Sequence, residues 1–214
     1  MSSDRRPATT EHRGAGTDAD LLVATDVVVN LGRRTVLRGV SAHVRQGEIL
    51  GLVGINGSGK TTLLRAVIGR VRLRGGRIRL AAGVEVGASI GSPAFLEHGT
   101  LRENLGLVLE RPDLEQALEE AGGLGLPTNT SLRTFSTGMR QRAAILRAGA
   151  GDVGLVLLDE PDEGLDDDGR SWLCDRLGAA QASGVGAIVV SHDRDWLSHV
   201  ASRIVRLHDG VVAS

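Results

Sequence analysis

The sequence predicts an α/β fold with a mainly parallel sheet, an N-terminal antiparallel β-subdomain and an inserted helical subdomain. Apolar runs at residues 49–53, 155–158 and 187–190 have the length and composition of buried parallel strands. Helical patterns separate these runs, and such alternation implies a parallel sheet with right-handed crossovers. Helix signals place the helical subdomain at about residues 96–150, between two of the strands.

Residues 1–20 are polar and charged, so we expect a disordered tail ahead of one domain at residues 21–214.

The strands are predicted from local composition. Segments rich in β-branched residues predict further strands at residues 21–30, 35–44, 77–80, 84–86, 204–207 and 211–212. The first two strands should pair in antiparallel fashion. The segment 77–80 is expected to belong to a hairpin with the strand after it, and the last two strands to another.

The helices follow from capping residues. Thr100 and Glu103 have the spacing of a capping box, which predicts a helix from Leu101 towards Leu109. Asp113 and Gln116 repeat this spacing and predict a second helix, ending at residues 122–123. Further helices are expected at residues 62–68, after Ser136, and at residues 169–181.

One glycine-rich stretch carries the strongest chemical signal. Residues 54–61 match the pattern G-x-x-x-x-G-K-[ST] at every specified position, between an apolar strand and a helix. Such a loop aims backbone N–H groups and the positive helix end at an anion, so this is the core of a P-loop NTPase. The residues expected to contact the phosphates are Asn56, Gly57, Ser58, Gly59, Lys60, Thr61 and Thr62.

Lys60 gives a check internal to the chain. It is the only lysine: of the 25 lysine and arginine residues, the other 24 are arginine. A compact ammonium fits between the β- and γ-phosphates as a point charge, whereas a guanidinium fork does not. The sequence therefore predicts a bound nucleoside triphosphate, with Lys60 acting on its phosphates.

Composition excludes several other classes of protein. The 214 residues carry a net charge of -1 and only 2% aromatic residues, which gives no reason to expect nucleic acid as a partner. No run of 18 or more apolar residues occurs, so no membrane span is expected. A single cysteine and a polar N-terminus predict a cytoplasmic protein.

Acidic residues and a histidine follow two of the predicted parallel strands. Asp159 and Glu160 come directly after the run at 155–158, at the strand end where such sheets bind ligands. Asp159 is expected to hold Mg2+ together with the hydroxyl of Thr61. Glu160 can act as general base on water. His192 follows the strand at 187–190 and can contact the γ-phosphate or orient the water.

With these residues in place, the arrangement resembles the nucleotide-binding domain of ABC transporters over about residues 21–214. Residues 54–61 resemble the Walker A loop of that family, and residues 155–160 its Walker B strand. Residues 135–142 resemble its signature motif, which is the most specific of the set. The segment 164–166 resembles its D-loop, and His192 its switch histidine.

The resemblance implies a mechanism and partners. Two domains would pair head to tail, as a homodimer or with a similar ATPase subunit. Ser136 and the backbone of Gly138 would contact the γ-phosphate held by the other subunit, with Asp166 of the D-loop beside the nucleotide. ATP would join the pair and hydrolysis would separate it, moving transmembrane permease subunits. The protein would then be peripheral on the inner face of the cell membrane.

Two positions depart from the family pattern. Leu31 stands where an aromatic residue usually stacks on adenine, which predicts modest ATP affinity and poor base selectivity. Gly91 stands where a glutamine or glutamate of the Q-loop usually reaches Mg2+ and the attacking water. Either Ser89 or Ser92 substitutes, or hydrolysis is slow.

The leading hypothesis is therefore an ATP-hydrolysing motor subunit of an ABC transporter. Export is expected from the Ser-x-Gly-Met form of the signature and the stretch at residues 92–95. One alternative is a soluble ABC-type ATPase that serves no transporter. Another is a regulatory nucleotide-binding module that hardly hydrolyses ATP, which Gly91 and Leu31 favour and Glu160 and His192 oppose.

Overall fold

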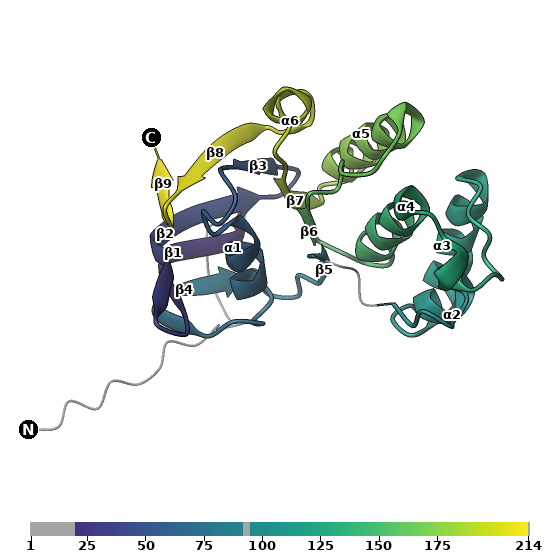
Figure 1. Cartoon of the computed structure of the whole chain (residues 1–214), viewed down its shortest axis with the longest axis horizontal. Helices are drawn as coiled ribbons and strands as arrows, with labels where there is room; N and C mark the ends of the chain where they lie inside the picture. The colour runs from purple at the N-terminus through teal and green to yellow at the C-terminus, as the bar shows by residue number, and fades with distance from the viewer. Residues whose placement is uncertain (1–19, 92–94, 214) are drawn as a thin grey trace, which may run out of the picture.

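A computed structural model describes residues 20–91 and 95–213. Residues 1–19 of the predicted tail lie outside this part of the chain, and Asp20, predicted as its last residue, begins a strand. Two sheets form the body of the molecule (Figure 1). A three-stranded antiparallel sheet has the order β2-β1-β4, with bounds Asp20–Leu31 for β1, Arg34–Arg45 for β2 and Leu73–Leu80 for β4. It is the predicted N-terminal β-subdomain.

The second sheet has six strands in the order β5-β6-β7-β3-β8-β9. Its strands are β3 (Ile49–Val53), β5 (Val86–Ser89), β6 (Leu155–Asp159), β7 (Gly186–Val190), β8 (Arg203–His208) and β9 (Val211–Ala213). All neighbours are parallel except β8 and β9, which form the predicted C-terminal hairpin. The predicted fold class is confirmed.

Helix α1 (Lys60–Val67) ties the two sheets together. Its apolar side chains, including Leu64, are buried in one cluster with inward residues of β1 and β2 and with residues of β3, β6 and β7. Strand β1 alternates, with Leu22, Ala24, Val27 and Val29 buried, while every residue of β7 is buried. This is the difference expected between a sheet with one open face and a parallel sheet covered on both faces.

The remaining helices are α2 (Leu101–Gly106), α3 (Arg111–Gly123), α4 (Thr137–Ala148), α5 (Asp167–Ala182) and α6 (Arg194–Val200), with a 3-10 turn at Leu132–Thr134. Helices α2 to α4 come between β5 and β6 in the chain and stand to one side of the sheets (Figure 1). They share their own apolar cluster, which contains Leu101, Leu118, Leu132 and Leu146. The subdomain boundary at residues 96–150 stays a prediction.

Three local predictions were wrong. The segment 77–80 forms no hairpin with the strand after it, because β4 pairs with β1 and β5 joins the other sheet. The helix predicted to start with a cap at Asp113 starts at Arg111, since Pro112 fits the first helical turn and Glu110 is its N-cap. Helix α2 ends at Gly106 rather than near Leu109, although the Thr100–Glu103 capping box is present.

Candidate functional site

The glycine-rich loop joins the end of β3 to the start of α1. Two of its glycines, Gly54 and Gly59, are required by close packing: a Cβ on Gly54 would lie 2.2 Å from the carbonyl oxygen of Leu207. Gly59 has a φ of 109° and caps α1, and a Cβ there would lie 2.7 Å from Leu37 Cδ2. Larger residues would therefore push the loop away from β2 and β8, because neither backbone nor core can yield cheaply.

Lys60 is the first residue of α1 and is only 6% exposed. Its Nζ donates to the carbonyl of Gly54 at 2.7 Å and lies 3.4 Å from the carbonyl oxygen of Ile55. The ammonium is thus held over the hollow of its own loop. A charge in this place, beside the N-terminus of a helix, attracts an anion.

Topology brings three strand ends to one edge of the sheet. Because the order is β6-β7-β3 and all three strands are parallel, their carboxyl ends lie side by side. Asp159 and Glu160 follow β6, His192 follows β7, and the glycine-rich loop follows β3. The sequence-predicted residues Lys60, Thr61, Asp159, Glu160 and His192 are therefore brought together.

Thr61 and Asp159 form the part of the site suited to a metal. The Thr61 hydroxyl donates to Asp159 Oδ2 at 2.9 Å. Asp159 Oδ1 is buried and, within the described residues, has no hydrogen-bond partner. A buried carboxylate oxygen without a donor is stabilised by a cation, and hard oxygen ligands suit Mg2+. These residues fit the predicted ion.

Glu160 is fixed by contacts on both its backbone and its side chain. It has a φ of 52°, and its N–H donates to the carbonyl of Val190 at 2.9 Å. Its Oε2 accepts from the backbone N–H of His192 at 3.0 Å, and its Oε1 lies 3.0 Å from His192 Nε2. Burial raises the pKa of the Glu160 carboxyl above its ordinary value, while the charges of His192 and Lys60 oppose that rise.

A cavity of about 370 Å³ joins these groups. The residues that line it are Leu31, Arg34, Val36, Asn56, Gly57, Gly59, Lys60, Thr61, Thr62, Asp159, Glu160 and His192. Ser58, which was predicted to contact phosphate, is 1% exposed and is not among these residues, although it lies within the loop. Of the sequence-predicted residues in the described chain, Ser136, Gly138 and Asp166 also lie outside the lining.

The signature-like segment is built differently. Ser136 is exposed and caps α4, its Oγ accepting from the N–H of Met139 at 3.2 Å. Gly138 lies against the next motif, since a Cβ there would stand 3.0 Å from the carbonyl oxygen of Gly164. Asp166 caps α5 through the N–H of Gly169 at 2.9 Å and pairs with Arg142. These contacts place the two motifs side by side on the surface.

The segment expected to act as Q-loop carries no side chain at Gly91. This glycine is exposed, has a φ of +65°, and a Cβ there would stand 3.4 Å from Arg65 Nη2. Ser92 lies outside the described residues. Ser89 is 6% exposed and lies within β5. The substitution of a serine for the missing glutamine therefore stays a prediction.

Sequence reasoning missed two contributions to the site. Gln141 Nε2 donates to the carbonyl of Glu160 at 3.1 Å, linking the signature helix to the site, although Gln141 stands within a motif quoted from the sequence. Arg34 and Val36 line the cavity from β2. In the sequence, the available signal was position: Gln141 stands within the signature-like motif, and Arg34 and Val36 lie close to the turn between the first two strands.

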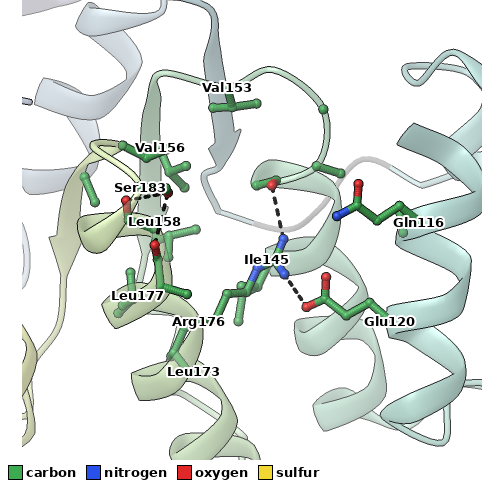
Figure 2. Close-up of a pocket in the computed structure, with 18 of the residues that line it drawn as sticks. Gln116, Glu120, Ile145, Val153, Val156, Leu158, Leu173, Arg176, Leu177 and Ser183 are labelled. Atoms are coloured by element: carbon green, nitrogen blue, oxygen red, sulfur yellow. Dashed lines mark hydrogen bonds and ion pairs between the residues drawn. The ribbon is translucent and has the colours of Figure 1, made fainter. Parts of the chain in front are cut away.

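A second cavity, of about 450 Å³, opens between α3, α4 and α5. Arg176 crosses it, pairing with Glu120 of α3 and donating to the carbonyl of Gly149 at 3.1 Å (Figure 2). Apolar residues such as Leu158 and Leu177 cover another side. None of the site residues predicted from the sequence lies in its described lining.

The ABC transporter family model matches residues 37–163. The chain belongs to this family. It is 34% identical over 199 residues to the zinc import ATP-binding protein ZnuC 2 of Hahella chejuensis, covering 88% of this chain and 79% of the relative. It is 33% identical to the aliphatic sulfonates import ATP-binding protein SsuB 2 of Mesorhizobium japonicum, with 95% and 84% covered.

Solved structures agree. An ATP-binding subunit of an ABC transporter superimposes with a TM-score of 0.81 at 27% identity, covering 91% of this chain and 88% of that one. A dimeric bacterial ABC transporter cassette gives a TM-score of 0.80 at 22% identity, with 90% and 97% covered, and shows the shared fold. The protein is thus an ABC transporter ATP-binding subunit and an ATPase. No helix in the described part of the chain is long and apolar enough to cross a bilayer.

Proposed function

We propose that this ATPase is the motor subunit of an ABC transporter and drives a separate membrane permease through ATP-dependent dimerisation. The observation that supports this most is the cluster at one end of the nucleotide cavity, where Lys60, Asp159 and Glu160 converge with His192. Each of these groups has a defined task in ATP hydrolysis.

In this proposal the glycine-rich loop binds the triphosphate through residues 56–62, and Lys60 turns its ammonium from the carbonyl of Gly54 to the β- and γ-phosphates. Thr61 and Asp159 hold Mg2+, Asp159 with the oxygen that is otherwise unpaired among the described residues. The ion, when bound, neutralises charge on the phosphate oxygens.

Glu160 is proposed as the general base that takes a proton from the attacking water. Its carboxylate is oriented from two sides by His192, through the backbone N–H and the ring. The raised pKa brings it closer to the working pH, which suits proton transfer. His192 is proposed to contact the γ-phosphate, which is supported by its position in the lining of the same cavity.

Ser136, Gly138 and Asp166 are proposed to act on the nucleotide of a second subunit. They lie outside the described lining of their own cavity, yet Ser136 offers a hydroxyl at the N-terminus of α4, where an anion is stabilised. A copy or a similar ATPase subunit, arranged head to tail, would complete both sites. Such a dimer would act on permease subunits from the cytoplasmic face of the cell membrane.

The lack of a side chain at Gly91 bears on the expected rate of ATP hydrolysis. With no side chain at the expected Q-loop position, placing the water falls to Glu160 and His192, so we expect slow turnover. This keeps the regulatory nucleotide-binding module as a second candidate. Export stays a prediction from the signature. The relatives named above are import proteins and give it no support.

The test is Mg2+-dependent ATP turnover by the purified chain beside Glu160→Gln, with dimer formation followed by analytical ultracentrifugation. We expect turnover to fall at least about 100-fold in the variant, the lower range for loss of a general base, while an ATP-bound dimer accumulates. Glu163→Gln, an exposed carboxylate outside the cavity, is the matched control.

Two outcomes would count against the motor. Turnover retained by Glu160→Gln would remove Glu160 as the base. ATP binding without turnover in the parent, even with permease-containing membranes added, would favour the regulatory module. Export and import are distinguished by measuring on which side of such membranes the substrate concentration falls during turnover.

A further inference from the structure

We propose that Arg34 binds the nucleobase by stacking its guanidinium plane on the ring, beside Leu31. This inference rests on the nucleotide binding proposed above and concerns the end of the cavity away from the phosphates. The Arg34 guanidinium would be the planar group that stacks on the base, since Leu31 in the same hairpin has no aromatic ring.

The cavity has two chemically distinct ends. Nine of its lining residues belong to the glycine-rich loop, the start of α1, or the ends of β6 and β7. The other three, Leu31, Arg34 and Val36, come from β1 and β2. Because the triphosphate is bound at the loop, the base attached to its other end reaches the wall formed by these three residues.

The hairpin is fixed against the loop. Leu31 and Arg34 are paired across the turn, so they end the two strands next to each other. A Cβ on Gly59 would lie 3.3 Å from the carbonyl oxygen of Val36, which shows how closely β2 approaches the loop. Further along β2, the N–H of Arg38 donates to the carbonyl of Gly210 at 2.8 Å. The wall at the base end is therefore held in position.

Arg34 is the side chain at this end with a π-system. The whole chain has two Phe, two Trp and no Tyr, and among the described residues no Phe or Trp lines the cavity, while the imidazole of His192 lies at the phosphate end. Leu31 is 46% exposed and offers aliphatic contact. Among the described residues, the exposed Arg34 guanidinium has no ion pair or hydrogen bond that would hold it elsewhere. A free guanidinium stacks on aromatic faces, and a base presents such a face.

The test is isothermal titration calorimetry of ATP, GTP and inorganic tripolyphosphate, with EDTA present to prevent turnover. In Arg34→Ala we expect the Kd for ATP and for GTP to rise about fivefold to tenfold, as for loss of one stacking contact. The Kd for tripolyphosphate, which has no base, should stay within about twofold of the parent. The matched control is Arg33→Ala, which removes an exposed arginine from the same turn but outside the cavity lining, and should leave all three Kd values unchanged.

Arg34→Lys separates stacking from charge. It keeps the positive charge and removes the plane, so it should bind ATP as weakly as Arg34→Ala. Full ATP affinity in Arg34→Lys, or an equal loss of ATP and tripolyphosphate binding in Arg34→Ala, would replace stacking with charge attraction. ATP binding by the parent with no change in Arg34→Ala would overturn the inference alone. A parent that binds neither ATP nor tripolyphosphate would overturn the proposed function as well.

Discussion

Lys60 and Ser136 stand at the starts of two helices, and both are expected to reach a phosphate, but their surroundings differ. Lys60 is 6% exposed and bonded to a carbonyl of its own loop, in a cavity shared with Asp159, Glu160 and His192. Ser136 is exposed and its hydroxyl is bonded only to the turn it caps. The first region is assembled from three neighbouring strand ends, whereas the second points outward from α4.

The comparison indicates which of the two regions can bind its ligand without a second protein molecule. Around Lys60 most polar groups already satisfy one another; the exceptions in the described chain are the buried hydroxyl of Ser58 and one oxygen of Asp159, and the latter fits a cation. Around Ser136 the same types of group face solvent, so they gain a ligand only when another molecule approaches. Variants should therefore affect nucleotide binding in one region and subunit association in the other.

The largest effect is expected for Lys60→Ala. It removes the ammonium from the phosphate end, so ATP turnover should fall at least about 100-fold, as when one preorganised electrostatic contact is lost. ATP affinity measured by calorimetry should fall with it. Arg65→Ala changes an exposed cation on the same helix and is the control. Turnover above about a tenth of the parent would show that Lys60 is dispensable.

Ser136→Asp should have a smaller and different effect. Aspartate caps a helix as well as serine does, so the melting temperature and ATP binding by the monomer should be unchanged. Its charge would face the γ-phosphate of the second subunit, and like charges at an interface cost several kcal/mol. Dimer formation with ATP, followed by sedimentation, should therefore be lost and turnover reduced. Ser136→Asn, an equally good neutral cap, is the comparison.

If Ser136→Asp forms the ATP-dependent dimer as readily as Ser136→Asn, the exposed region does not meet phosphate. The contrast between the two regions would then be one of burial alone. The monomer's ATP affinity is the internal check, because damage to the fold would lower it as well.

The smallest effect is a shift in pH dependence. A base works only when deprotonated, and burial raises the pKa of Glu160, so activity is lost on acidification at a higher pH than for an ordinary glutamate. The charge of His192 opposes the rise. In His192→Ala the acid limb of kcat/KM should therefore move to higher pH, whatever happens to the maximal rate. Movement to lower pH would show that another group titrates.

Local sequence patterns predicted those elements that depend on residues close together in the sequence. The apolar runs became β3, β6 and β7, and the Thr100–Glu103 pattern became a capping box. The pairing of β4 with β1 joins residues 44 to 58 positions apart, from Val29 with Leu73 to Leu22 with Leu80, and no short-range signal contains it. The cap pattern at Asp113 predicted the start of α3 too late, because Pro112 fits the first helical turn and Glu110 is the N-cap.

The site shows the same division. The glycine-rich motif identified Lys60 and Thr61, and Asp159 was inferred from its position after a buried strand; the parallel order of the strands brings all three together. The bond from Gln141 to the carbonyl of Glu160 and the place of Arg34 in the cavity depend on how separate segments pack. Such contacts are set by tertiary structure, so residue type and spacing did not reveal them.

Lys60 is also the only lysine of the chain. Apart from the α-amino group, the protein thus has a single aliphatic amine, and it lies under the triphosphate in the proposed complex. Acylation by an amine-reactive reagent, read by peptide mass spectrometry, would then report nucleotide occupancy directly, with no engineered label. Because the chain has a single lysine, the unmodified protein can be used for this footprinting experiment.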